Sequence, residues 1–229
     1  MPKPTCYMCD EEATSREHVP PATFFPELKD SPEGRDYRRN LITVPSCPQH
    51  NSSKSGDDQY LATVIAACIQ TNEVAQRLMT PKTLRALRYR PGVIGFFDRL
   101  SAIRLGTVET GAFYIDRTRF DRVMDHQARG LYFTHFGQKL TGQVTLHTSD
   151  LFLTEHPRAK AHNLQTRSLT DFITSFIAAS PGVGENQDVF YYQVMEGSGG
   201  KALIRMVFYG GFVVDALASS AHEAQSGDA

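Results

Sequence analysis

Two short pairs of potential metal ligands near the N-terminus constrain the fold of this 229-residue chain more than any other feature. They are Cys6-x-x-Cys9 and Cys47-x-x-His50. Each spacing allows two side chains on a tight turn to converge on one ion. Three thiolates and one imidazole would complete a tetrahedral site with no open position, which is typical of structural rather than catalytic zinc. The sequence therefore predicts a structural Zn²⁺ site.

The segment between the two pairs is longer than in a zinc finger that reads DNA with one helix. This length favours a treble clef, in which a hairpin lies between the pairs and a helix follows the second. A Cys-x-x-Cys pair can instead be a redox pair, but no βαβ pattern precedes Cys6. The fourth cysteine, Cys68, lies in an apolar run and is predicted to be a small buried core residue.

Polar residues that could act in catalysis or bind a metal lie between and just after the two pairs. Glu17-His18 follows the first pair, Asn40 precedes an apolar β-branched segment, and Asn51 follows His50. The order Cys-x-x-Cys, Glu-His-x-x-Pro, Asn-Leu, Cys-x-x-His-Asn-x-x-Lys resembles the HNH endonuclease family over about the first quarter of the chain. Glu-His-Val-Pro-Pro with Leu-Ile-Thr-Val-Pro-Ser-Cys is also similar to a bacterial subgroup of uncharacterised HNH-type proteins.

The resemblance implies roles for four residues. His18 would be the general base, Glu17 and Asn51 would hold one divalent cation, Mg²⁺ or Mn²⁺, and Asn40 would orient the imidazole. The sequence departs from the family pattern at three positions: Glu17 replaces the commoner Asp, His50 replaces a Cys, and Asn51 replaces a His. The first and third changes keep an oxygen ligand for a hard cation, and the second keeps a zinc ligand.

These residues predict a metal-dependent endonuclease that hydrolyses phosphodiester bonds. Duplex DNA is the default substrate by resemblance, and RNA remains open. The alternative is a zinc-bound treble clef that binds nucleic acid or protein without cutting, which leaves Glu17, His18, Asn40 and Asn51 without a role. A third hypothesis makes His50 the third catalytic residue and leaves three cysteines on the zinc.

Several basic residues are candidates for phosphate contacts. Three lie in a polar loop, one follows the second ligand pair, and two are three residues apart within a basic segment at 77–104, where they can share a helix face. They are Arg35, Arg38, Arg39, Lys54, Arg85 and Arg88. Because the formal net charge of the chain is −1, solvated surface roles remain an alternative for the loop and for the basic segment.

Composition indicates an ordinary globular protein, with 41% hydrophobic residues and no tryptophan. The sequence shows no apolar signal region and no apolar run of membrane-spanning length. Three of four cysteines lie in the ligand pairs, which favours a reducing, cytoplasmic location. We expect a nuclease module at 1–70, a basic helical connector at 71–110, an α+β domain of unknown role at 111–218 and a disordered tail at 219–229.

The predicted fold class is α+β. Within the N-terminal module, strands are expected at 16–19, with His18 on the inner face, and at 41–44, beginning next to Asn40. A glycine at position 130 is the expected end of a helix. The remaining predicted helices are 59–70, 71–79, 113–130 and 168–179, and the remaining strands are 142–147, 189–195, 202–209 and 212–214.

Overall fold

A computed structural model of the chain describes residues 4–31, 34–68, 70–79, 101–105, 108–112, 115–148 and 157–219, with backbone alone at 101–105, 108–112 and 157–160. The fold is mixed α and β with antiparallel sheets, which confirms the predicted class at this level. A Cys3His cluster lies near the N-terminus. No helix in the described ranges combines the length and apolar character needed to cross a membrane.

The longest helices are α5 and α6, and α2 directly follows the second ligand pair. The α-helices are α1 (Pro48–Asn51), α2 (Ser55–Ala66), α3 (Glu73–Leu78), α5 (Arg117–Phe136) and α6 (Pro157–Ile177). Short 3-10 turns are η1 (Ala22–Phe24), η2 (Leu28–Asp30), η4 (Ser52–Lys54) and η7 (Ser198–Gly200). The predicted helices at 59–70 and 71–79 thus correspond to α2, which ends at Ala66, and α3, which begins at Glu73.

The strands form two hairpins and one larger sheet. They are β1 (Ser15–His18), β2 (Thr43–Ser46), β3 (Ser101–Leu105), β4 (Val108–Ala112), β5 (Val144–Thr148), β6 (Phe190–Glu196), β7 (Ala202–Phe208) and β8 (Phe212–Ala218). β1 pairs with β2, β3 pairs with β4, and the four-stranded sheet has the order β5-β8-β7-β6. The predicted C-terminal hairpin and third strand are confirmed, and β8 is longer than expected.

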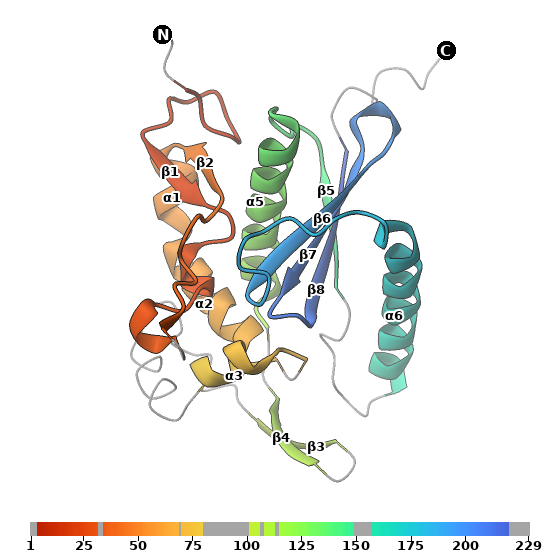
Figure 1. Cartoon of the computed structure of the whole chain (residues 1–229). Coiled ribbons are helices and arrows are strands. Elements are labelled where there is room, and N and C mark those ends of the chain that lie inside the picture. Colours follow the sequence, from red (N-terminus) through yellow and green to blue (C-terminus); the bar gives the residue numbers. More distant parts are fainter. Residues whose placement is uncertain are drawn as a thin grey trace, which may run out of the picture.

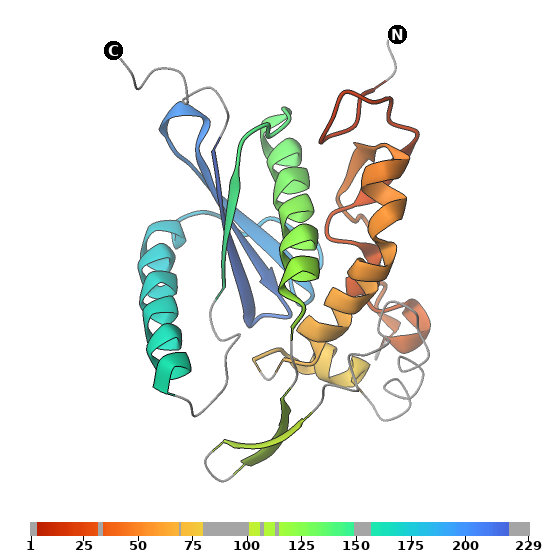
Figure 2. The same cartoon turned by 180° about the vertical axis from the view of Figure 1, so that it is seen from behind.

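The elements stack in layers around α5 (Figures 1 and 2). The β1–β2 hairpin, α1 and α2 lie on one side of α5, and the four-stranded sheet lies on the other. α6 covers the opposite face of that sheet. The ligand pairs therefore belong to an outer layer that rests on α5, not to a detached finger.

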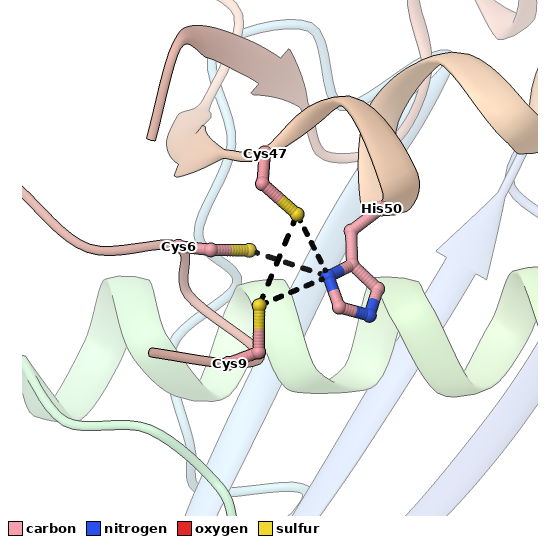
Figure 3. Close-up of side chains that lie close together, drawn as sticks. All are labelled: Cys6, Cys9, Cys47 and His50. Carbon is pink, nitrogen blue, oxygen red and sulfur yellow. Dashed lines mark hydrogen bonds between the residues drawn. The ribbon is translucent and has the colours of Figure 1, made fainter. Parts of the chain in front are cut away.

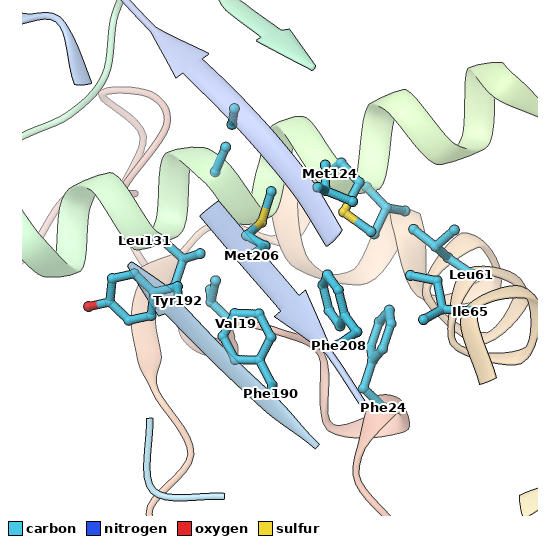
Figure 4. Close-up of a cluster of buried hydrophobic side chains, with 14 of the residues drawn as sticks. Val19, Phe24, Leu61, Ile65, Met124, Leu131, Phe190, Tyr192, Met206 and Phe208 are labelled. Atoms are coloured by element: carbon cyan, nitrogen blue, oxygen red, sulfur yellow. The ribbon is translucent and has the colours of Figure 1, made fainter. Parts of the chain in front are cut away.

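One continuous apolar core joins the N-terminal layer to the sheet (Figure 4). Phe24 packs against Phe208 with a ring-centroid separation of 5.2 Å, although these residues are far apart in the chain. Leu61 and Ile65 of α2, together with Met124 of α5, belong to the same buried cluster. Burial of such side chains is worth about 1.5–3 kcal/mol each. This core crosses both of the boundaries that we placed between the predicted domains.

A close contact between α5 and the residue after β1 explains one wrong helix boundary. Gly130 was expected to end its helix, but it lies inside α5, where a Cβ would come within 2.7 Å of Val19 Cγ2. The helix ends instead at Gly137, which adopts a left-handed conformation with φ of 69°. The glycine at 130 thus serves close packing between helix and hairpin.

The inner face of α6 differs from the amphipathic pattern expected at 168–179. Ile173 and Ile177 are buried against the sheet, but Leu169, Phe172 and Phe176 are exposed. Ile173 and Ile177 pack with Leu203 of the sheet, and the sheet also offers a polar contact to α6. Arg205 of β7 forms a two-pronged ion pair with Asp215 of β8 and donates to Thr174 Oγ1 of α6 at 2.6 Å.

Candidate metal centre and the strand beside it

Four side chains converge near the N-terminus to form a candidate metal centre (Figure 3). Cys6, Cys9, Cys47 and His50 point toward one another, and their ligand atoms all lie within 4.8 Å of each other. Cys6 and Cys47 are buried, whereas Cys9 and His50 are partly exposed. The structure thus brings together the four predicted zinc ligands, and the cluster could hold a metal ion such as zinc.

The distances within the cluster fit a tetrahedral ion. The Cys9 and Cys47 sulfurs are 3.8 Å apart, and His50 Nδ1 lies 3.5 Å from the sulfurs of Cys6 and Cys9 and 3.2 Å from that of Cys47. A tetrahedral Zn²⁺ with ordinary bond lengths separates two sulfurs by about 3.8 Å and a sulfur from a nitrogen by about 3.6 Å. The side chains therefore need little movement to bind such an ion.

The surroundings of the thiols shift the pKa values of Cys6 and Cys9 in opposite directions. Burial raises the pKa of Cys6, but hydrogen bonds with the backbone of Met8, Cys47 and Cys9 outweigh it, so that the pKa falls to about 7. Burial and the neighbouring sulfurs of Cys47 and Cys6 raise the pKa of Cys9 to about 11. A divalent cation would favour the thiolate form of all the cysteines that it binds.

Backbone hydrogen bonds hold the two ligand pairs in place. Cys6 N donates to Glu11 O at 2.9 Å, which closes the turn that carries the first pair. Tyr7 N donates to Pro45 O at 2.9 Å and ties this turn to β2. Pro48 opens α1 directly after Cys47, so that one helical turn brings His50 back beside the Cys47 sulfur. The geometry thus arises from local turns and one hairpin.

The two faces of β1 separate Glu17 from His18. Glu17 is 4% exposed, whereas Arg16 and His18 on either side of it are exposed. Because successive side chains of a strand point to opposite faces, Glu17 faces the protein interior and His18 faces outward. The prediction that His18 lies on the inner face is wrong, since Glu17 and the following Val19 fill that side of the hairpin.

The Glu17 carboxylate is held by a buried lysine. Lys54 is 2% exposed, and its Nζ lies 2.8 Å from Glu17 Oε1 and 2.8 Å from Asp58 Oδ2. Ser46 Oγ donates to the other Glu17 oxygen at 3.2 Å. Burial raises the pKa of Asp58, and the ammonium of Lys54 offsets this in part. Tyr7 is also buried here, and burial, followed by the charge of Glu17, raises its pKa.

This arrangement does not fit the predicted Mg²⁺ or Mn²⁺ on Glu17 and Asn51. The ammonium of Lys54 already holds Glu17 Oε1, and Ser46 Oγ donates to Glu17 Oε2. The Asn51 amide donates to Ser15 Oγ at 2.9 Å and to Arg16 O at 3.5 Å, so its side chain braces β1. A hard cation requires several converging oxygen ligands, and these two residues do not present them as folded.

The side chain of Asn40 bonds a residue other than the imidazole that it was expected to orient. It precedes β2, has a positive φ of 52°, and its side-chain nitrogen donates to Glu185 Oε2 at 2.6 Å. His18 is instead the register partner of Thr43. Within the described ranges the His18 imidazole makes no hydrogen bond. The four predicted catalytic residues therefore occupy three separate surroundings.

The basic residues predicted to contact phosphate also differ in their surroundings. Lys54, predicted to contact nucleic acid, is buried in the ion cluster. Arg35 forms an ion pair with Asp188, and Arg38 donates to Phe25 O at 3.1 Å and to Glu27 Oε1 at 3.4 Å. Arg39 is exposed. Arg85 and Arg88 lie outside the described residues.

Sequence reasoning missed several residues beside the site. Lys54 and Asp58 are four apart, and this spacing on a helical segment was a signal for an ion pair. His126 of α5 lies with its ring centroid 5.7 Å from that of His50. Burial, followed by the charge of Lys54, lowers the pKa of His126 to about 4, so the ring is neutral near pH 7.

Comparisons with models of known protein families, with curated proteins and with solved structures found no match to this chain. The likeness to HNH endonucleases therefore rests on the residues quoted above. The function has to be inferred from the site itself.

Proposed function

We propose that the chain hydrolyses phosphodiester bonds of nucleic acid on the outer face of β1, with His18 as the general base. One observation carries this proposal: an exposed imidazole without a hydrogen-bond partner in the described ranges lies beside an exposed guanidinium fixed on the same face. Arg16 and His18 are two residues apart on one strand, which places them on one face.

Arg16 is oriented by the strand opposite. Its Nε donates to Thr43 Oγ1 and one terminal nitrogen donates to Thr43 O, both at 2.8 Å, and Thr43 is the register partner of His18. A guanidinium has five N–H donors, so donors remain for an anion after these two bonds. The fork geometry of arginine suits phosphate, and a fixed side chain loses little entropy on binding.

In the proposed reaction, His18 takes a proton from a water molecule, because an imidazole is the usual base near neutral pH. The water oxygen forms a bond to phosphorus as the bond from phosphorus to the leaving oxygen breaks. Solvent supplies the proton to the leaving oxygen. The Arg16 guanidinium stabilises the negative charge that builds on the phosphoryl oxygens.

The ion in the Cys3His centre has a structural role in this proposal, and we assign it as Zn²⁺. Four protein ligands leave no coordination position for water or substrate. The ion would fasten the first turn to α1 and thereby fix the hairpin that presents His18, as in a treble clef. Duplex DNA is the proposed substrate because of the resemblance to HNH endonucleases, with RNA as the substrate to test beside it.

A second candidate is a zinc-bound module that binds nucleic acid or protein without cutting. The ion pair between Glu17 and Lys54 favours it, because the acid beside His18 is neutralised and buried. In that case His18 and Arg16 would contact phosphate or an acidic partner, and no bond would break.

A plasmid-nicking assay separates the two candidates. Zinc-loaded protein would be incubated with supercoiled DNA, and in parallel with single-stranded RNA, without added metal and with Mg²⁺ or Mn²⁺. Nicking by the wild type that disappears in His18→Asn supports the nuclease. Tight binding without nicking under every condition supports the module. Nicking that strictly requires added divalent metal would support the predicted catalytic Mg²⁺ or Mn²⁺ in addition to the structural Zn²⁺.

The matched control for this assay is Gln49→Ala. Gln49 is an exposed residue on α1 beside the site, and its side chain carries no proposed role. It should nick DNA at the wild-type rate. If His18→Asn and Gln49→Ala retain equal activity, any nicking by the preparation does not come from the proposed site.

A further inference from the structure

The cluster behind β1 is a buried cation site whose occupant is part of the chain. Lys54 Nζ lies 2.8 Å from Glu17 Oε1 and 2.9 and 2.8 Å from the two Asp58 oxygens. Ser46 Oγ bonds the second Glu17 oxygen at 3.2 Å. All four residues are buried. Two carboxylates around one ammonium leave the cluster with surplus negative charge when both acids are ionised.

We propose that Lys54 supplies the resident cation of this site, so that its ammonium and a divalent cation exclude each other at Glu17. The oxygens that a divalent ion would take are already within hydrogen-bond distance of the ammonium. An ion bound to these oxygens would lie about 2.0–2.6 Å from each of them. It would overlap the lysine nitrogen, which lies 2.8–2.9 Å from the same oxygens. The site cannot hold both.

The backbone and the two buried carboxylates also keep the Lys54 ammonium in the cluster. Lys54 ends η4 and directly precedes α2, while Asp58 lies in the first turn of that helix, so the backbone holds lysine and acid four residues apart. Moving the ammonium to solvent would leave two buried carboxylates without a counter-ion, which is strongly unfavourable. The wild type should therefore bind no divalent cation through Glu17.

This inference goes beyond the proposed hydrolysis and does not depend on it. It states which cation belongs beside Glu17, whether or not His18 cuts DNA. It also predicts that a divalent site is latent in the chain and appears when the ammonium is removed and its space is left free.

The test is Mn²⁺ binding to the zinc-loaded full chain, measured by electron paramagnetic resonance and by calorimetry. Lys54→Ala removes both the charge and the volume, and should bind one additional Mn²⁺ at least about tenfold more tightly than the wild type. Adding Glu17→Gln to that variant should abolish the gain. Lys54→Met removes the charge but fills the space, and serves as the matched control without the additional ion.

Two results would overturn the proposal. One is a wild type that binds Mn²⁺ in a manner lost in Glu17→Gln, and the other is a folded Lys54→Ala that gains no site. If Lys54→Ala does not fold, as judged by circular dichroism and zinc content, wild type and Glu17→Gln decide alone: equal Mn²⁺ binding supports the proposal. Because the readout is binding, loss of nicking in the plasmid assay bears only on the proposed function.

Discussion

The side chains of the four residues of β1 alternate between two faces, one closed by the protein interior and one open to solvent. The inner face presents Glu17 to Ser46 and Lys54, and it is closed by a hydrogen bond and an ion pair. The outer face presents Arg16 and His18 to solvent. The contrast teaches that adjacency in sequence places Glu17 and His18 on opposite sides of a strand, where they cannot act on one ligand without a change in the hairpin.

The largest expected effect concerns the metal centre that both faces depend on. Cys47→Ser should release the metal and unfold the hairpin, because binding free energy of about 10–16 kcal/mol for structural zinc is also folding free energy. Elemental analysis and circular dichroism check this. Cys68→Ser is the matched control, since Cys68 lies outside the cluster and should keep the metal. A well-folded wild type without bound metal would contradict the assignment.

Next comes the inner face. Lys54→Met should destabilise the protein by about 3–5 kcal/mol, because it leaves buried carboxylates uncompensated. Urea unfolding measures the change. Lys29→Met, at an exposed lysine paired with Glu27, should have no measurable effect. Equal stability of both variants would show that the inner cluster adds nothing to the fold, and the contrast between the faces would fail.

The outer face should respond in the opposite way. His18→Ala should leave zinc content and the unfolding midpoint unchanged, since the imidazole is exposed and makes no hydrogen bond within the described ranges. Under the proposed function it should lower the nicking rate by about two to four orders of magnitude. Both quantities would be measured on one preparation. Release of zinc by this variant would show that His18 has a structural role rather than a catalytic one.

The smallest effect is expected at Arg16. Arg16→Ala should weaken DNA binding modestly and reduce the slope of log affinity against log salt by about one, the signature of one lost phosphate contact. Fluorescence anisotropy across a salt titration checks this. Arg117→Ala on α5, where Arg117 pairs with Asp121, is the control. An unchanged slope in Arg16→Ala would assign this arginine to bracing Thr43.

Local patterns in the sequence were sufficient for much of the fold. The spacing of Cys6, Cys9, Cys47 and His50 predicted the cluster, because ligand pairs on turns are set by nearby residues. β-branched and aromatic runs predicted β2 and the β6–β7 hairpin. The extent of each element was less certain, as the ends of α5 and β8 show.

What could not be predicted depends on partners distant in the chain. Whether Glu17 or His18 faces inward depends on what lies behind the hairpin, and Lys54 is buried only because two acids surround it. Which residues of α6 face inward likewise depends on the sheet, where Leu203 packs with Ile173 and Arg205 donates to Thr174. No periodicity in one segment carries this information, because it belongs to two segments at once.

The contact between Gly130 and Val19 couples two positions that must vary together. A glycine inside a helix costs about 1 kcal/mol relative to alanine, so α5 accepts a weak helix former where the hairpin passes. The same small volume can be filled from the helix or from the hairpin, but not from both. A methyl group at 130 should be tolerated only when Val19 becomes smaller, so Gly130→Ala should be harmful alone and rescued by Val19→Ala.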